Sequence, residues 1–215
     1  MKKKKKSTEG EFTGRKGNMV SYELNGQVVS RTIGEVTSWS DAQKQVQMKT
    51  RLISPILKAT KKYIDLGFKT TPRPQTWSIN NKATSENNPA AVTGIYPDLT
   101  VDYSKLLFSM GTLPMPKNAL VQLVDNVITF TWEADLENEN ADEDDQIMLL
   151  AYFPETNSTM TVLSGARRTE QQDKIVLTSW TKQTVIETYL SFVSEDRNNV
   201  SNSVYSGQLI WGINS

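Results

Sequence analysis

The second half of the chain constrains the fold most, because from residue 119 onward short apolar runs alternate with turn residues at regular spacing. About seven short strands over about 95 residues are typical of a small β-sandwich. Trp132 and Tyr189 lie where such a core takes aromatic side chains. We therefore expect a seven-stranded antiparallel β-sandwich at residues 117–215. The predicted strands are 119–124, 127–132, 146–153, 159–163, 174–178, 184–193 and 203–211.

The start of the chain shows a hairpin pattern. Alternating residues at 19–24 and 27–33 flank Asn25-Gly26, a dipeptide that tolerates positive φ and favours a type I′ turn. We predict a β-hairpin there. An isolated hairpin is only marginally stable, so this one is expected to pack on another surface.

A helical period follows, from about residue 41 to about residue 66. Ser40 and Gln43 are spaced as a capping box, and Gly67 favours an end of the helical stretch. Pro55 lies in the middle and cannot donate a helix hydrogen bond. The pattern predicts either two helices, about 41–53 and 55–66, with Pro55 opening the second, or one kinked helix.

Between the helical stretch and the strands, residues 68–94 show neither period and are rich in Pro, Asn, Ser and Thr, so we predict connecting chain. Residues 95–116 are interpreted as a joint, with an apolar extended half followed by a half rich in Gly and Pro. If the joint pairs with a sheet, four of its residues should be buried: Tyr96, Leu99, Val101 and Tyr103.

Together these patterns predict a mainly β chain with a helical N-terminal segment, α+β overall. The expected divisions are a disordered basic arm at 1–11, a segment with hairpin and helix at 12–94, the joint at 95–116 and the sandwich at 117–215. Lys2–Lys6 resembles the start of a signal peptide, but polar residues follow it, so we expect no Sec signal and synthesis in the cytoplasm. No run of 18 apolar residues occurs, so no membrane span is predicted.

Charge is unevenly distributed along the chain, although the formal net charge is zero. Residues 1–69 contain 15 Lys and Arg against 6 Asp and Glu, while residues 70–215 contain 9 against 18. Such a split favours head-to-tail association of copies or contact with an anionic partner, but unevenly placed surface charges give the same counts. Nonspecific contact of the basic first third with nucleic-acid phosphates is a further alternative, although no base-reading motif accompanies it.

Two sets of charged residues are candidates for contact. Six bases on the predicted helices are candidate anion or subunit contacts: Lys44, Lys49, Arg51, Lys58, Lys61 and Lys62. Seven acids form a candidate acidic contact loop: Asp135, Glu137, Glu139, Asp142, Glu143, Asp144 and Asp145. An EF-hand loop needs Gly at its sixth position and Glu at its twelfth, where this chain has Asn140 and Gln146. We therefore predict a solvated strand connection, with calcium binding as the alternative.

Catalytic and metal chemistry finds no support in the residue types. The chain has no His and no Cys, which excludes histidine bases, thiolate nucleophiles and zinc–thiolate sites. The sequence also lacks the phosphate-loop, dinucleotide-binding and serine-hydrolase motifs. We predict a protein that is not an enzyme and needs no cofactor.

Several segments occur in an order that resembles a family of uncharacterised proteins of similar length from Bacteroidota bacteria. They are the GRKGNMVSY segment Gly14–Tyr22, the helix start with Gln43 and Arg51, YPDLTVDYSKLL at Tyr96–Leu107, YLSFVSED at Tyr189–Asp196 and VSNSVY at Val200–Tyr205. The resemblance implies an immunoglobulin-like or fibronectin type III-like module in the second half, and it supplies no catalytic residues. Lys2–Lys6 and the acidic loop depart from the family pattern.

The leading hypothesis is a non-enzymatic structural or assembly protein, a homo-oligomer or part of a larger assembly such as a phage-like particle or surface filament. The alternative is a glycan- or protein-binding surface module that uses the sandwich loops. Trp180, Trp211 and Tyr152 are the expected contacts for that alternative. A third hypothesis is a calcium-dependent adhesin that uses the acidic loop.

Overall fold

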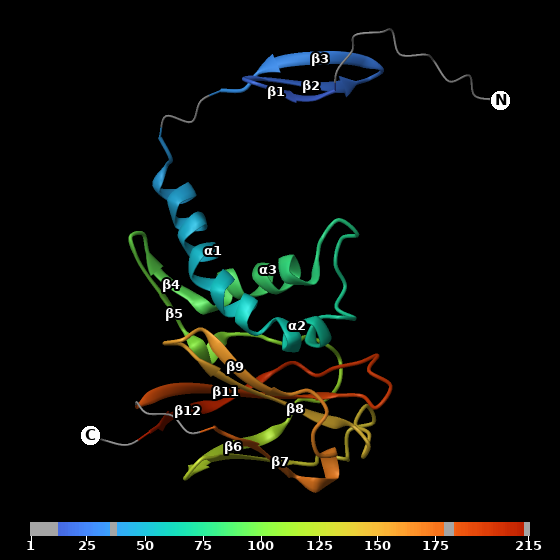
Figure 1. The fold of residues 1–215 in the computed structure, drawn as a ribbon. Coiled ribbons are helices and arrows are strands. Elements are labelled where there is room, and N and C mark those ends of the chain that lie inside the picture. The colour runs from blue at the N-terminus through green and yellow to red at the C-terminus, as the bar shows by residue number, and fades with distance from the viewer. Residues whose placement is uncertain (1–12, 35–37, 179–182, 213–215) are drawn as a thin grey trace, which may run out of the picture. The chain divides into compact units, whose positions relative to one another are not determined.

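The computed structural model describes residues 13–34, 38–178 and 183–212 and divides into two compact units, residues 1–40 and 41–215 (Figure 1). The boundary follows Ser40 and does not fall in the predicted joint, because helices and later strands belong to one unit. The predicted arm at 1–11 lies outside the described residues. None of the described helices is long and apolar enough to cross a membrane.

The first unit contains a three-stranded antiparallel sheet, in the order β1 (Gly14–Lys16), β2 (Met19–Leu24), β3 (Gln27–Thr32). The predicted hairpin is confirmed, with Asn25 and Gly26 at φ values of 53° and 81° in its turn. The sequence pattern did not predict β1. No residue at 13–34 or 38–40 is buried, so the described part of this sheet has no core of its own.

The second unit has a strand at each of the seven predicted positions. They form two antiparallel sheets, one of three strands in the order β10-β7-β6 and one of four in the order β12-β11-β8-β9. The chain is thus mainly β with helices, α+β overall. The observed bounds are β6 (Lys117–Val124), β7 (Val127–Glu133), β8 (Gln146–Phe153), β9 (Ser158–Val162), β10 (Gln172–Val176), β11 (Thr184–Val193) and β12 (Val204–Trp211).

Helix α1 (Asp41–Ala59) runs through Pro55, and α2 (Lys61–Gly67) follows after Thr60. The alternative with two helices, divided at residues 53–55, therefore places the break about one and a half turns of helix too early, whereas Gly67 does end the helical stretch. Pro55 is tolerated because it is exposed, so water can satisfy the carbonyl that its missing N–H leaves free. Ile53, Ile56 and Leu57 are buried on both sides of it and hold the helix to the core.

Part of the predicted connecting chain at 68–94 is helix α3 (Ile79–Ala91). Its polar sequence gives no apolar stripe, so tertiary contacts stabilise it instead. Ser78 caps the start by accepting a hydrogen bond from Asn81 N at 3.1 Å. The buried Asn87 side chain donates to Leu107 O at 2.8 Å and accepts from Leu107 N at 2.7 Å. This pair of bonds fixes a polar helix to the chain of the joint.

The apolar half of the joint is a hairpin, not a single strand. β4 (Val92–Ile95) pairs with β5 (Asp98–Val101) across a turn with a cis Tyr96–Pro97 bond. Leu99 is buried as predicted, and Val101 and Tyr103 are half-buried, but Tyr96 is exposed because it lies in the turn.

The second half of the joint is fixed to the core and is not a free linker. After the short 3-10 turn η1 (Tyr103–Lys105), the chain runs beside the segment that precedes β12. Ser109 Oγ donates to Ser201 O at 2.7 Å, and Leu113 N donates to Val200 O at 3.0 Å. These bonds bring the helical part and the strands into one unit.

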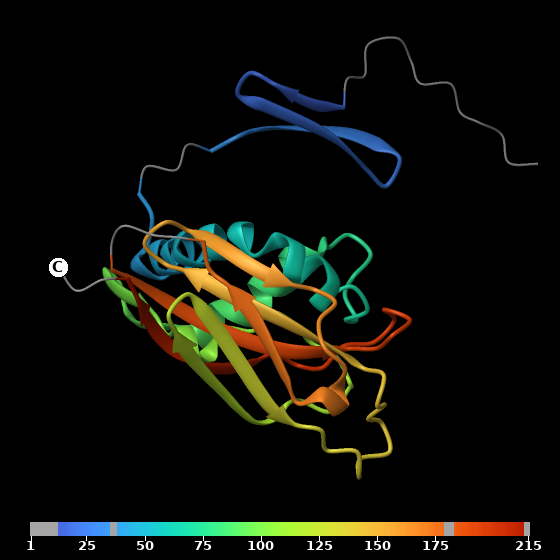
Figure 2. The ribbon, with the colours of Figure 1, turned by 60° about the horizontal axis from the view of Figure 1, so that its bottom comes forward.

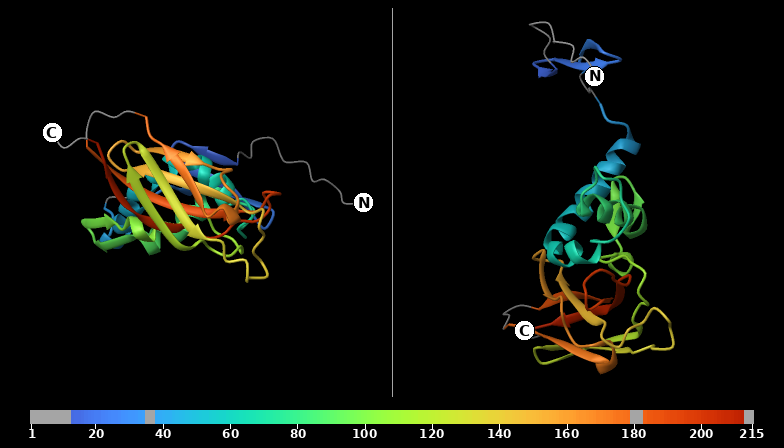
Figure 3. Two further views of the ribbon diagram at one scale, coloured as in Figure 1. Left: turned by 90° about the horizontal axis from the view of Figure 1, so that it is seen from below. Right: turned by 90° about the vertical axis from the view of Figure 1, so that its right-hand side faces the viewer.

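Three layers build the second unit, with the four-stranded sheet in the middle (Figures 1 and 2). On one face of β8, Met148, Leu150 and Tyr152 pack with buried residues of α1 and α2. On the other face, Leu149 and Ala151 pack with residues of β7. Figure 3, left, looks onto the three-stranded sheet that covers this second face. Both faces of the central sheet are therefore buried.

Candidate functional site

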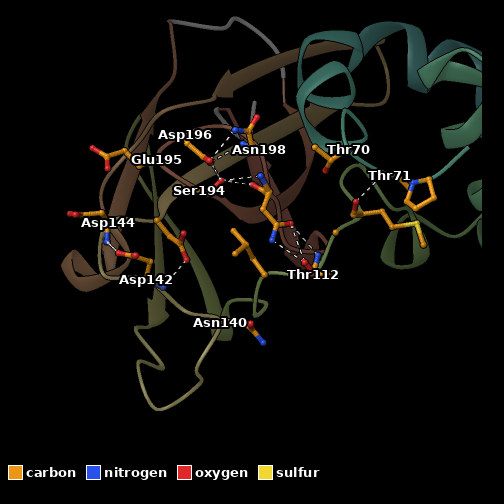
Figure 4. Close-up of a pocket in the computed structure, with 16 residues that line it drawn as sticks. Thr70, Thr71, Thr112, Asn140, Asp142, Asp144, Ser194, Glu195, Asp196 and Asn198 are labelled. Atoms are coloured by element: carbon orange, nitrogen blue, oxygen red, sulfur yellow. Dashed lines mark hydrogen bonds between the residues drawn. The ribbon is translucent and has the colours of Figure 1, made fainter.

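A cleft of about 850 Å³ opens at the end of the sheets where β11 ends and β8 begins (Figure 4). Four segments line it: the loop after α2 at 70–72, the chain at 110–113, the acidic loop at 140–145 and the β11–β12 loop at 194–199. These segments are far apart in sequence. The fold brings them together because the joint runs beside the chain that leads into β12.

The cleft combines apolar side chains with carboxylates. Pro72, Met110 and Leu113 contribute apolar surface. No Lys or Arg is among the lining residues. The carboxylates come from Asp142, Asp144, Asp145, Glu195 and Asp196. This arrangement can bind a cationic partner that also brings apolar atoms.

Hydrogen bonds hold the β11–β12 side of the cleft in place. Asp196 accepts from Ser194 Oγ at 2.7 Å and from Asn198 N at 2.9 Å, and these bonds lower the pKa of its carboxyl group below the usual value. Asn199 Nδ2 donates to Thr112 Oγ1 at 2.9 Å, which ties this loop to the joint. Asp196 therefore keeps its negative charge to lower pH than a free aspartate.

A buried ion pair supports the acidic wall. Arg168 is 0% exposed, and its Nη2 donates to Asp145 Oδ2 at 2.8 Å. The guanidinium also stacks over the Phe192 ring, 3.7 Å from its centroid. Asp145 Oδ2 also accepts a hydrogen bond from Asp142 N at 3.2 Å, so the ion pair is connected to the backbone of the acidic loop. The prediction that Asp145 belongs to a solvated contact loop is wrong, because this carboxylate is buried against Arg168.

The rest of the acidic loop is split between paired and exposed residues. Asp135 pairs with Lys117 at 2.8 Å, and Asp144 pairs with Arg167 at 2.9 Å. Four acids of the loop are exposed: Glu137, Glu139, Asp142 and Glu143. Among the described residues, no group of three or more Asp and Glu is arranged to hold a metal ion. The loop therefore offers charge to a partner surface and gives no geometric support to a calcium site.

The six candidate bases lie on α1 and α2, away from the cleft lining. Lys44 pairs with Asp41, Lys61 pairs with Asp65, and Lys44 Nζ also lies 5.7 Å from the centre of the Tyr96 ring. Lys44 and Lys49 are half-buried, while four bases are exposed: Arg51, Lys58, Lys61 and Lys62. Lys58 and Lys61 also line a smaller cleft of about 350 Å³ between the helices.

Two of the three aromatic contacts expected for a binding module are not on the surface. Tyr152 and Trp211 are buried, so they are core residues, and Trp180 lies outside the described residues. Burial also raises the pKa of Tyr152 and Tyr189 above the usual tyrosine value. Tyr189 donates its hydroxyl proton to Tyr103 O at 2.7 Å, which links β11 to η1.

Sequence reasoning missed Arg168, the residue that fixes the acidic wall. It lies in a 3-10 turn, η2 (Arg168–Glu170), between β9 and β10, where neither helical nor strand periodicity marks a residue as buried. The only signal was the adjacent pair Arg167-Arg168, which looks like ordinary surface charge. Only the structure shows that one of these two side chains is buried and the other exposed.

Comparison with known proteins identifies a family but transfers no activity. No curated protein matches the chain. Residues 12–207 match the model of a family described as a family of unknown function, DUF6266. Because the match extends over both units and includes every segment that lines the cleft, the chain belongs to this DUF6266 family.

Proposed function

We propose that the protein is a non-enzymatic structural or assembly protein whose copies associate, as a component of a phage-like particle or a surface filament. The observation that carries the proposal is the contrast between the two units. The second unit has two hydrophobic clusters, whereas no described residue of the first unit is buried. A sheet without a core gains its stability from another surface.

The first unit also exposes the apolar residues that such a contact needs. Met19, Tyr22 and Leu24 on β2 are 49%, 40% and 52% exposed. They belong to a small sheet in which the other described residues are polar, charged or half-buried. Tyr22 and Leu24 are two residues apart on the strand and so lie on one face of the sheet, and neighbouring exposed apolar residues commonly mark a protein–protein contact. Association would cover them and would complete the first unit.

We also propose that residues 117–215 form a fibronectin type III-like sandwich. With the seven strands named A to G in chain order, the sheets are E-B-A and G-F-C-D. A constant-type immunoglobulin domain instead places its fourth strand beside the fifth, in the A-B-E-D sheet. The position of β9 beside β8 thus favours the fibronectin-like arrangement.

Light scattering over a series of protein and salt concentrations tests the assembly function. We expect the weight-average mass to rise above that of one chain as protein concentration increases, most strongly at low salt, where charges are least screened. A protein that stays monomeric at high concentration and low salt would overturn the proposal.

The alternative is a glycan- or protein-binding surface module, and the observation that favours it is the loop-lined cleft. Its polar groups, such as Asn198 and Thr112, could bind a ligand without the aromatic contacts expected from the sequence. Isothermal titration calorimetry with a panel of soluble oligosaccharides tests this function. Measurable heats that disappear in Asn198→Ala would favour it over assembly.

A further inference from the structure

Strand pairing in the first unit sorts its side chains into two different faces. Directly paired residues of antiparallel strands point to the same face of a sheet. Val20 pairs with Arg31 and with Arg15, Tyr22 pairs with Val29, and Leu24 pairs with Gln27. We call these residues the arginine face. It consists of Arg15, Val20, Tyr22, Leu24, Gln27, Val29 and Arg31.

The arginine face is apolar and positively charged, and it carries no carboxylate. Glu23 lies on the opposite face with Val28, and so does Lys16 with Met19. Arg15, Arg31, Tyr22 and Leu24 are all exposed. A row of two arginines therefore lies beside an apolar patch on one side of the sheet. That side is unpartnered within the described residues of its own unit.

Net charge decides which kind of surface can cover this face. Residues 1–40 contain 8 Lys and Arg against 4 Asp and Glu, a net charge of +4, and residues 41–215 contain 16 against 20, a net charge of −4. Two first units would repel each other, whereas a first unit attracts the second unit of a neighbouring copy. Charge therefore favours a head-to-tail contact over a symmetric contact between two first units.

The acidic cleft is the part of the second unit that complements the arginine face. Two arginines beside the cleft lining are already paired, because Arg167 and Arg168 form ion pairs with Asp144 and Asp145. The Arg197 guanidinium donates to Leu163 O and to Gln146 Oε1. By contrast, Asp142, Glu195 and Asp196 form no ion pair within the described part of the chain.

We propose that the arginine face of one copy docks onto the acidic cleft of a second copy, so that copies associate head to tail. Arg15 and Arg31 meet the unpaired carboxylates Asp142, Glu195 and Asp196. The apolar patch around Tyr22 and Leu24 meets the apolar surface of Met110, Leu113 and Pro72. This inference rests on the proposed assembly function and adds the two surfaces and their polarity. A head-to-tail contact does not close on itself as a two-fold contact does, so it generates rings or filaments.

A charge-swap experiment tests the two surfaces. The face variant carries Arg15→Glu and Arg31→Glu, and the cleft variant carries Asp142→Lys and Glu195→Lys. Each variant alone should be monomeric by sedimentation velocity under conditions where the wild-type protein associates, because like charges then face each other. A mixture of the two should associate again, because each reversed surface meets its complement.

Matched control variants are Lys16→Glu on the opposite face of the sheet and Glu155→Lys in the exposed β8–β9 turn, and both should associate like the wild type.

The possible outcomes separate this inference from the proposed function. If the wild type associates and either variant alone associates equally well, the head-to-tail surfaces are wrong while the assembly function stands. If both variants are monomeric but their mixture is too, the two surfaces do not meet each other and the inference fails. A monomeric wild type would overturn both. Melting temperatures test whether the variants are folded. We expect them to fold, because all four substituted residues lie outside the two hydrophobic clusters.

Discussion

Two antiparallel sheets in this chain differ in what covers them, and the difference is visible in their sequences. The β1-β2-β3 sheet has no buried residue, and β2 (MVSYEL) mixes polar and apolar residues. The β12-β11-β8-β9 sheet is buried on both faces, and β8 (QIMLLAYF) is nearly continuous in apolar residues. Antiparallel sheets commonly expose one face and alternate accordingly. A strand such as β8, which is apolar at nearly every position, thus indicates a sheet that lies between two other layers.

A buried ion pair stabilises the second unit together with apolar packing, and its loss should have the largest effect on the free energy of unfolding. Arg168→Ala leaves the Asp145 carboxylate buried without its cation, so the free energy of unfolding should fall by about 3–5 kcal/mol. Urea denaturation measures the loss.

Arg167→Ala is the matched control, because the neighbouring arginine pairs with Asp144 at the surface. It should cost less than about 1 kcal/mol. Equal losses for the two substitutions would mean that the Arg168 pair is not buried in solution.

Two-sided burial of the central sheet gives the next prediction. Leu149 and Leu150 are adjacent on β8, are fully buried and face opposite layers. Leu149→Ala and Leu150→Ala should each lower the free energy of unfolding by about 2–5 kcal/mol. Leu120→Ala on β6, at a site that is 65% exposed, should change it by less than about 0.5 kcal/mol. A small effect of Leu150→Ala alone would show that the helices do not cover the sheet.

Elements of the fold could be predicted from the sequence where local interactions determine them, and they were missed where long-range contacts stabilise them. Periodicity located all seven strands of the second unit and the Asn25-Gly26 hairpin, because alternation and turn chemistry are local. It missed α3, because long-range bonds from Asn87 to Leu107 stabilise a polar helix. Of the candidate site, the exposed acids were anticipated. Burial of Asp145 was not, because it depends on Arg168, 23 residues away in sequence.

Alkaline pH should lower the free energy of unfolding, because the folded chain buries tyrosine hydroxyl groups. Burial raises the pKa of Tyr63 and Tyr189. Above the unfolded-state value near pH 10, the unfolded chain loses tyrosine protons that the folded chain keeps. The free energy of unfolding should therefore fall as pH rises above about 10, by about 1.4 kcal/mol per pH unit for each such tyrosine. Below about pH 10 these groups should add no pH dependence.

Urea denaturation at several alkaline pH values measures this slope. Tyr63→Phe removes one of the protected groups and should make the slope shallower by about 1.4 kcal/mol per pH unit. The same substitution also removes the hydrogen bond to Ser191, so the comparison uses slopes and not absolute stabilities. Identical slopes for the variant and the wild type would contradict the burial of the Tyr63 hydroxyl.

The smallest effect on unfolding is expected in the first unit, where the same kind of substitution should instead weaken association. Leu24 is 52% exposed, so Leu24→Ala in dilute protein should change the free energy of unfolding by less than about 0.5 kcal/mol, whereas Leu190→Ala in β11 should cost about 2–5 kcal/mol.

Leu24 belongs to the arginine face, however, and its contact with a second copy removes apolar surface from water. We expect Leu24→Ala to raise the dissociation constant for association about tenfold, which corresponds to about 1.4 kcal/mol. Sedimentation equilibrium measures it. An unchanged dissociation constant together with a large loss of stability would mean that the first unit is covered within its own chain, and the contrast between the two sheets would disappear.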